Sequence, residues 1–160
     1  SQDSNRYFAA LILFAVALLI TGALVRSGFG RTLVAIRENE DRATMIGYDV
    51  QRFKLIAVIA SGVLSGASGA AYALLFGYAG ATFATVQYSI FPLLWVLLGG
   101  AGTTIGPLIG AVFMFYLIDY ASGLTNAYLL LVGIVLVALT LFAPQGIVGT
   151  IRARWIRWLP

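Results

Sequence analysis

Long apolar runs separated by short polar stretches dominate the chain. The first uncharged run covers residues 7–25, and at about 1.5 Å per residue it is just long enough to cross a hydrocarbon core of roughly 30 Å. Four more apolar runs follow, at residues 55–80, 90–102, 105–120 and 127–143. The pattern predicts an all-α, polytopic membrane protein with about five transmembrane helices in a single domain over residues 1–160.

The amino-acid composition indicates a membrane protein and excludes several kinds of functional site. The chain is 61% hydrophobic and 10% charged, whereas soluble domains have about 25% charged residues. It contains no cysteine and no histidine, which excludes disulfides, thiolate nucleophiles, imidazole bases and the commonest zinc sites. We therefore expect no enzyme activity, no catalytic residues, no bound cofactor and no metal. The chain begins at Ser1 without an initiator methionine or signal peptide, so we expect a fragment or a processed piece.

The basic residues predict the orientation of the chain in the membrane. Six lie between Arg26 and Lys54 and three lie in the tail at 144–160, whereas the connections at 81–89 and 121–126 have none. Because basic residues favour the cytoplasmic side, we expect the loop and the tail to be cytoplasmic and the N-terminus outside. The alternative is that residues 90–107 form a re-entrant hairpin, which would place the tail outside.

One polar stretch, GRTLVAIRENEDRATMIGYDVQRFK, holds five of the ten basic and four of the six acidic residues. The pairs Arg37–Asp41 and Glu38–Arg42 have the i,i+4 spacing of neighbours on a helix. Gly47 suits the position after a helix end, and Asp49 suits the N-cap of the next helix. These features predict one polar helix over residues 32–46 at the cytoplasmic surface. It could transmit force to a protein beneath the membrane, or it could be a solvated connector.

Small residues recur every fourth position in the second predicted span, and this spacing lies on one helix face. Such a face lets another helix pack closely. The alternative interpretation is a face that lines a pathway. The predicted packing residues are Ser61, Gly62, Ser65, Gly66, Gly69 and Ala73.

A glycine-rich segment separates the third and fourth predicted spans. It lacks the lysine of a phosphate-binding P-loop, so any ATP hydrolysis belongs to a separate subunit. The segment predicts either a broken helix beside a transport pathway or a tight turn between two packed spans. Its candidate residues are Gly99, Gly100, Gly102, Thr103, Gly106, Pro107 and Gly110.

Two further features carry candidate roles. Asp119 is the one acid predicted within or near the bilayer, where burial of a charge is costly. It is a candidate for a role where substrate enters, for a structural ion pair, or for solvation at the membrane edge. In the tail, Ile151, Trp155, Trp158 and Leu159 share one helical face, which predicts an interfacial helix, with contact to an ATPase as the alternative.

Three segments resemble the permeases of branched-chain amino-acid ABC transporters, of the LivM and LivH types. These are residues 30–73, LLGGAGTTIGPLIGA and LFAPQGIVG, which occur in the family's order. The segment LFAPQGIVG near the C-terminus and the sequence AIRENE at residues 35–40 favour the LivM type. Family members carry further spans before the equivalent of Tyr7, so the resemblance covers roughly the C-terminal half and a complete pore is not expected from this chain alone.

The resemblance implies a multi-pass permease of the bacterial inner membrane that imports branched-chain or other hydrophobic amino acids. It implies ABC ATPase subunits, a second permease subunit and an extracytoplasmic binding protein as partners. Urea or short amides are an alternative cargo, and a secondary transporter or channel subunit is the competing class. The resemblance places a coupling helix within residues 30–47 and implies ATPase contact by Gly30, Arg31, Ala35, Ile36, Arg37, Glu38, Asn39, Glu40, Ala43 and Gly47.

Overall fold

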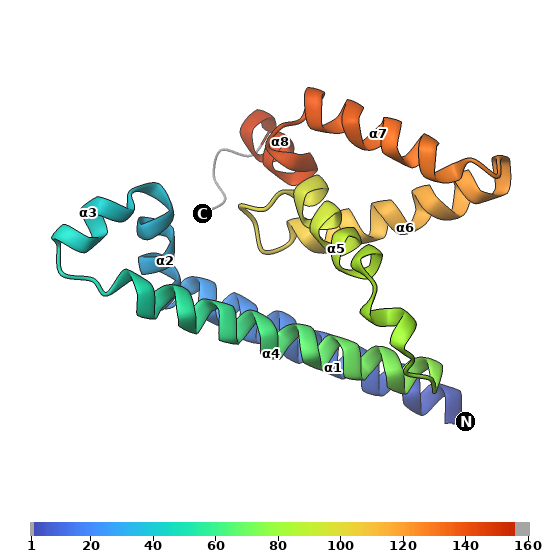
Figure 1. Ribbon diagram of the computed structural model, residues 1–160, viewed down its shortest axis with the longest axis horizontal. Coiled ribbons are helices and arrows are strands. Elements are labelled where there is room, and N and C mark those ends of the chain that lie inside the picture. The colour runs from blue at the N-terminus through green and yellow to red at the C-terminus, as the bar shows by residue number, and fades with distance from the viewer. Residues whose placement is uncertain (1, 156–160) are drawn as a thin grey trace. The chain divides into compact units, whose positions relative to one another are not determined.

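The computed structural model describes residues 2–155, and every regular element in this range is a helix (Figure 1). The chain divides into two compact units, Ser1–Ala79 and Gly80–Pro160, and each is described by itself. The first unit contains α1 (Gln2–Arg26), α2 (Gly28–Glu38), α3 (Glu40–Met45) and α4 (Val50–Phe76). The second contains a short 3-10 helix η1 (Ala81–Ala84), then α5 (Val86–Gly99), α6 (Gly106–Leu124), α7 (Tyr128–Phe142) and α8 (Gly146–Trp155).

Four helical stretches of the described residues are long and apolar enough to cross a membrane. Three are α1, α4 and α6, and the fourth, Tyr128–Trp155, joins α7 and α8 across a short break. The fold is therefore that of an all-α polytopic membrane protein. Helix α5 has 14 residues, which is about 21 Å and less than the hydrocarbon core. Five full crossings thus stay a prediction, because α5 has the length that the re-entrant alternative requires.

The N-terminal unit is a long helical hairpin. Helices α1 and α4 lie side by side, with α2 and α3 at the end where the chain turns back (Figure 1). Half-buried residues recur every three or four positions along both helices, which is the spacing of a helix-helix seam. They are Ala10, Leu13, Ala17, Thr21 and Leu24 in α1, and Ala57, Ala60, Leu64, Ala67 and Ala71 in α4.

The C-terminal unit packs around one small core. Met114 of α6 is fully buried and lies against Leu98 of α5 and Val132 of α7. Ala121 completes the buried cluster, and Ile147 of α8 packs against it from the side. Helix α6 therefore forms the centre of this unit, against which α5, α7 and α8 pack.

Several helix ends differ from the predicted spans. Helix α1 begins at Gln2 rather than at residue 7. Helix α4 ends at Phe76 rather than near residue 80 because Gly77 takes a left-handed φ of +66°. The prediction that residues 81–89 form a short non-helical connection was wrong in part, since this stretch contains η1 and the first turn of α5.

The ends of the later helices lie closer to the predicted ends than those of the earlier helices do. The turn predicted to begin after residue 120 is still helical, and α6 continues through Asp119 and Ser122 to Leu124. Helix α7 agrees with the predicted span 127–143 to within one residue at each end. The predicted tail contains the helix α8, whose buried first residue is Gly146.

Candidate functional site

The predicted coupling segment is two short helices, so the prediction of one helix over residues 32–46 was wrong. The break is at Asn39, whose backbone is extended at φ −158°. Its N–H donates to the Ala35 carbonyl, 3.0 Å away, and ends α2, while its Oδ1 accepts from the Arg42 N–H at 2.9 Å and caps α3. One residue thus satisfies groups at both helix ends, as an asparagine N-cap can.

The break also separates the two charge pairs that the helical spacing predicted. Arg37 and Asp41 lie on opposite sides of Asn39, as do Glu38 and Arg42, and neither pair forms an ion pair within the part of the chain that the structure describes. The i,i+4 rule holds only where one helix continues through both positions.

The turn from α3 to α4 follows the sequence prediction. Gly47 has φ +100°, its N–H donates to the Thr44 carbonyl, and the Tyr48 N–H donates to the Ala43 carbonyl. These two bonds form a Schellman motif, in which a left-handed glycine closes the helix end. Asp49 then caps α4, with its Oδ1 accepting from the Arg52 N–H at 3.3 Å. Both predicted caps are confirmed.

A small apolar core holds α2 and α3 against the start of α4. Ile36, Ala43 and Val50, spaced seven residues apart, are 6%, 4% and 7% exposed and pack together with Phe53. Phe53 also stacks on Phe29, with ring centroids 5.6 Å apart. Ile36 and Ala43 were predicted to contact an ATPase, but their side chains are buried in contacts within this chain.

Gly30 has a structural role where α2 turns away from α1. A Cβ at this position would overlap the carbonyl oxygens of Leu24 and Val25. Ser27 closes the same corner: its Oγ donates to the Leu24 carbonyl at 2.6 Å and accepts from the Gly30 N–H at 3.3 Å. Only glycine fits this close approach of two helices.

The remaining residues of the predicted coupling set are on the surface. Two large apolar side chains that the sequence analysis did not select are also exposed there, Met45 at 87% and Ile46 at 69%. They lie off the buried seven-residue repeat and immediately before the Gly47 turn, which is the signal that could have found them. The exposed residues of the predicted set are Arg31, Ala35, Arg37, Glu38, Asn39, Glu40 and Gly47.

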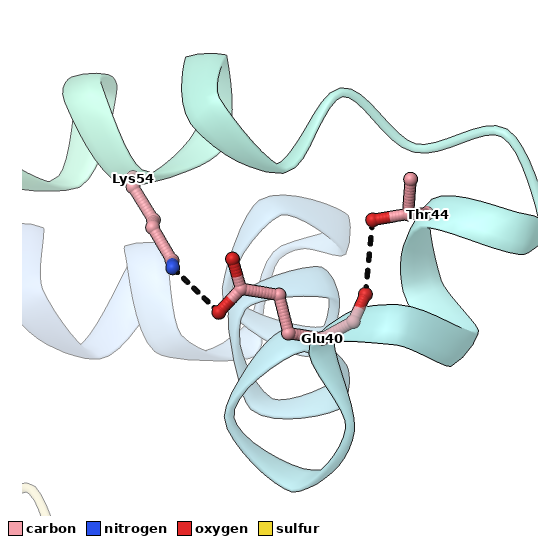
Figure 2. A network of polar contacts seen from close by, with 3 residues as sticks. All are labelled: Glu40, Thr44 and Lys54. Atoms are coloured by element: carbon pink, nitrogen blue, oxygen red, sulfur yellow. Dashed lines mark hydrogen bonds and ion pairs between the residues drawn. The ribbon is translucent and has the colours of Figure 1, made fainter.

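Two ion pairs form in the described residues of this region. Asp49 and Arg52 pair within the first turn of α4, with Oδ2 and Nε 2.9 Å apart. Glu40 of α3 and Lys54 of α4 pair across the turn, with Oε2 and Nζ 2.7 Å apart (Figure 2). Both pairs are largely exposed. Only the second joins two different helices.

The glycine-rich segment is a turn between two packed helices, α5 and α6. Its glycines allow backbone contact, because a Cβ at Gly99 would overlap Gly106 and a Cβ at Gly110 would overlap the Trp95 carbonyl. Thr103 holds the turn, since its Oγ1 donates to the Gly100 carbonyl at 3.1 Å and accepts from the Gly106 N–H at 3.0 Å. Pro107 is in the first turn of α6, where its missing N–H is tolerated.

The turn is also joined to the start of α8, a contact that the sequence analysis missed. Gly100 has φ +113° and Gly146 has φ +77°, and a Cβ at Gly146 would overlap the backbone of Gly100. The two segments that carry the family resemblance in this unit therefore touch each other. Gly102 has no such contact. A position beside a transport pathway stays a prediction for this segment.

The row of small residues on α4 is exposed in this chain. Ser61, Gly62, Ser65, Gly66 and Gly69 are all on the surface, while Ala73 is half-buried. A Cβ at the glycines would have no neighbour within 4 Å. Helix α1 uses a different face of α4, so packing of another helix on this row stays a prediction.

Asp119 lies on an open groove along α6. The groove has a volume of about 590 Å³ and is lined mostly by apolar groups, with the Asp119 carboxylate and the Ser122 hydroxyl as polar exceptions. The buried Nε1 of Trp95, which also lines it, has no hydrogen-bond partner among the described residues. The other lining residues are Ala111, Val112, Phe115, Tyr116 and Ile118.

Two of the four residues predicted to share a helical face in the tail lie within the described residues. Helix α8 places Ile151 and Trp155 on the surface, at 50% and 86% exposure, whereas Trp158 and Leu159 lie outside the described residues. No group of three or more acidic, histidine or cysteine side chains that could hold a metal is found within residues 2–155.

Comparison with known proteins identifies relatives over most of the chain. LivM of Escherichia coli K12, a high-affinity branched-chain amino acid transport permease, is 27% identical over 146 residues, which cover 91% of this chain and 34% of LivM. The probable LivM and LivH permeases of Methanocaldococcus jannaschii are 28% and 32% identical, and the matches cover 88% and 85% of this chain. This chain spans about a third to a half of the length of these relatives. No solved structure matches.

The family model described as "Branched-chain amino acid transport system / permease component" matches residues 1–143. This range includes the hairpin of α1 and α4, the α2–α3 segment and the glycine turn of the second unit. Together with the apolar helices, the match describes a multi-pass protein of the inner membrane. The chain belongs to the family of branched-chain amino acid transport permease components.

Proposed function

We propose that this chain is part of the membrane-spanning permease subunit of an ABC importer for branched-chain or other hydrophobic amino acids. A separate ATPase subunit drives it, a second permease subunit completes the pathway, and an extracytoplasmic binding protein delivers the substrate. Family membership supports this assignment, and the relatives matched are permeases of branched-chain amino acid transport systems. Urea or short amides are the alternative cargo.

The observation that carries the proposal is the form of the α2–α3 segment. Its helices are held to α4 by the Ile36, Ala43 and Val50 core, so the segment is a preformed unit rather than a loose connector. Met45 and Ile46 are exposed at its end among charged residues, and large exposed apolar side chains mark interaction sites. We assign this end as the point that docks on the ATPase.

Point variants test the docking assignment. The full-length permease is tagged and purified from native membranes as Met45→Ser with Ile46→Ser, and bound P-loop ATPase is measured. We expect at least a tenfold loss of bound ATPase, because losing two buried apolar contacts costs more than about 1.5 kcal/mol. Val34→Ser is the matched control, since Val34 is also exposed and apolar but is in the middle of α2.

The outcomes separate two errors. If the double variant retains the ATPase as the unaltered protein does, the docking point is elsewhere. If no ATPase accompanies the unaltered protein with its loop intact, the importer assignment fails, and a secondary transporter or channel becomes the better description. Uptake of leucine, valine and urea by the intact complex then distinguishes the two classes of cargo.

We also propose that the groove beside Asp119 is on the substrate's route. An apolar groove with a few placed polar groups is the usual form of a small-molecule site, and an amino acid presents an ammonium group that a carboxylate would attract. The glycine turn and the small-residue row on α4 would then pack against the partner permease or against further helices of the full-length subunit.

A further inference from the structure

We propose that the ion pair between Glu40 and Lys54 is a brace that makes α4 move together with α3. The inference rests on the proposed function, in which an ATPase moves the α2–α3 segment. Glu40 and Lys54 are then positioning residues: they bind neither substrate nor ATP, and they act by holding one helix to another.

The pair bridges the weakest point of the connection. Between α3 and α4 the chain runs through a non-helical turn at residues 46–49, in which Gly47 has φ +100°. A turn built on glycine can change its backbone angles with little resistance. The Nζ of Lys54 and the Oε2 of Glu40 approach to 2.7 Å across this turn, although the residues are 14 positions apart (Figure 2).

The acidic partner is well placed to resist movement. Glu40 is the first residue of α3, where an acidic side chain interacts favourably with the positive end of the helix dipole. Its carbonyl accepts from the Thr44 Oγ1 at 3.0 Å, which ties it into the following turn (Figure 2). A force on α3 therefore reaches the Glu40 carboxylate through a single short helix.

The basic partner is on the face of α4 that already contacts the segment. Val50, Phe53 and Lys54 have the spacing i, i+3 and i+4, which places them on one side of the helix. Val50 is in the apolar core with Ile36 and Ala43, and Phe53 packs against it. The ion pair thus lies one turn beyond Val50 on this side of α4, next to Phe53.

The second ion pair of the region provides a matched control. Asp49 and Arg52 are also exposed and oppositely charged, with a 2.9 Å contact, but both belong to the N-terminus of α4. Reversing Arg52 changes the charge of the same helix by the same amount without separating α3 from α4. Any effect specific to Lys54 is therefore not an effect of net charge or of membrane orientation.

The experiment uses the full-length permease assembled with its ATPase and reconstituted in vesicles. The variants are Glu40→Lys, Lys54→Glu, the double swap, Lys54→Arg and Arg52→Glu. The first measurement is substrate transported per ATP hydrolysed, with ATPase co-purification measured in parallel. The second is hydrogen exchange of the residue 41–46 amides in the permease without ATPase.

We expect Glu40→Lys and Lys54→Glu each to lower transport per ATP about fivefold and to speed exchange in α3 by a similar factor, which is the upper range for an exposed ion pair. The double swap restores both quantities to within about twofold, and Lys54→Arg and Arg52→Glu leave them near the unaltered values. ATPase co-purification stays unchanged in the three variants that keep Glu40, which are Lys54→Glu, Lys54→Arg and Arg52→Glu. A purely structural role would not give transport uncoupled from ATP hydrolysis.

Three results would overturn the brace. The first is unchanged exchange and unchanged transport per ATP in the single variants, and the second is a double swap that fails to recover. The third is loss of the ATPase from Lys54→Glu, which would place Lys54 in the docking surface. Exchange in the isolated permease tests the brace even if no ATPase binds the unaltered protein, which is the separate failure of the proposed function.

Discussion

Replacing Gly146 with alanine tests the contact between the glycine turn and α8. Gly146 is buried and has φ +77°, a conformation that costs a non-glycine residue about 1–2 kcal/mol. The new Cβ would also overlap the backbone of Gly100, and overpacking of this kind costs about 1–3 kcal/mol. The sum predicts a loss of roughly 2–5 kcal/mol in the free energy of unfolding.

The measurement is denaturant unfolding of the full-length protein in detergent, followed by loss of helical circular dichroism. Gly133→Ala is the control, since Gly133 is inside α7 with no heavy atom within 4 Å of the added Cβ. There alanine should stabilise by up to about 1 kcal/mol, because it is a better helix former. The two alanine substitutions are therefore expected to have opposite signs.

A third variant separates the two causes at this position. Asparagine tolerates positive φ better than alanine does, but its side chain would meet the same Gly100 backbone. We expect Gly146→Asn to keep the loss of about 1–3 kcal/mol from the overlap with Gly100, but to be less destabilising than Gly146→Ala because its backbone cost is smaller. If Gly146→Asn unfolds at the denaturant concentration of the unaltered protein, the close approach is refuted. If Gly146→Ala also unfolds at that concentration, the backbone argument is refuted as well.

Four other substitutions have defined expectations. Asn39→Ala should destabilise the start of α3 by about 1 kcal/mol, measured by faster hydrogen exchange there, because the N-cap bond is lost. Ile36→Ala should cost about 2 kcal/mol or more and expose the α2–α3 segment to protease, since the side chain is buried. Gly66→Leu should leave the protein alone unchanged but prevent assembly, because the site is open in this chain and is predicted to receive another helix. Asp119→Asn should lower uptake at least fivefold with assembly intact, and unchanged uptake would remove Asp119 from the proposed route.

Local features of the coupling segment could be predicted well, whereas its tertiary contacts could not. The Gly47 turn and the Asp49 cap depend on residues within five positions of one another, and both are present. The break at Asn39 was missed because the sequence there also fits a continuous helix. In the structure the break accompanies the packing of Ile36 and Ala43 against Val50 of α4, a contact between helices that the local sequence does not specify.

In the candidate site, too, the sequence predicted a set of residues but not which of them are buried. Family resemblance selected a set of residues without separating those that hold the segment from those that face outward. Burial separates them: Ile36 and Ala43 are internal, and Met45 and Ile46, which were not selected, are exposed. Periodicity on α4 likewise found a row of small residues, but only the structure shows that α1 packs on another face.

The sequence by itself determined that this protein is an all-α membrane protein of the branched-chain amino acid permease family, with its charge concentrated in one loop. These properties depend on hydropathy, residue spacing and motifs, which are local properties of the sequence. The tertiary structure alone decided the Gly100–Gly146 contact, the buried loop core and the Glu40–Lys54 pair. Each joins residues that are distant along the chain, and their proximity depends on the packing of whole helices, which no local pattern specifies.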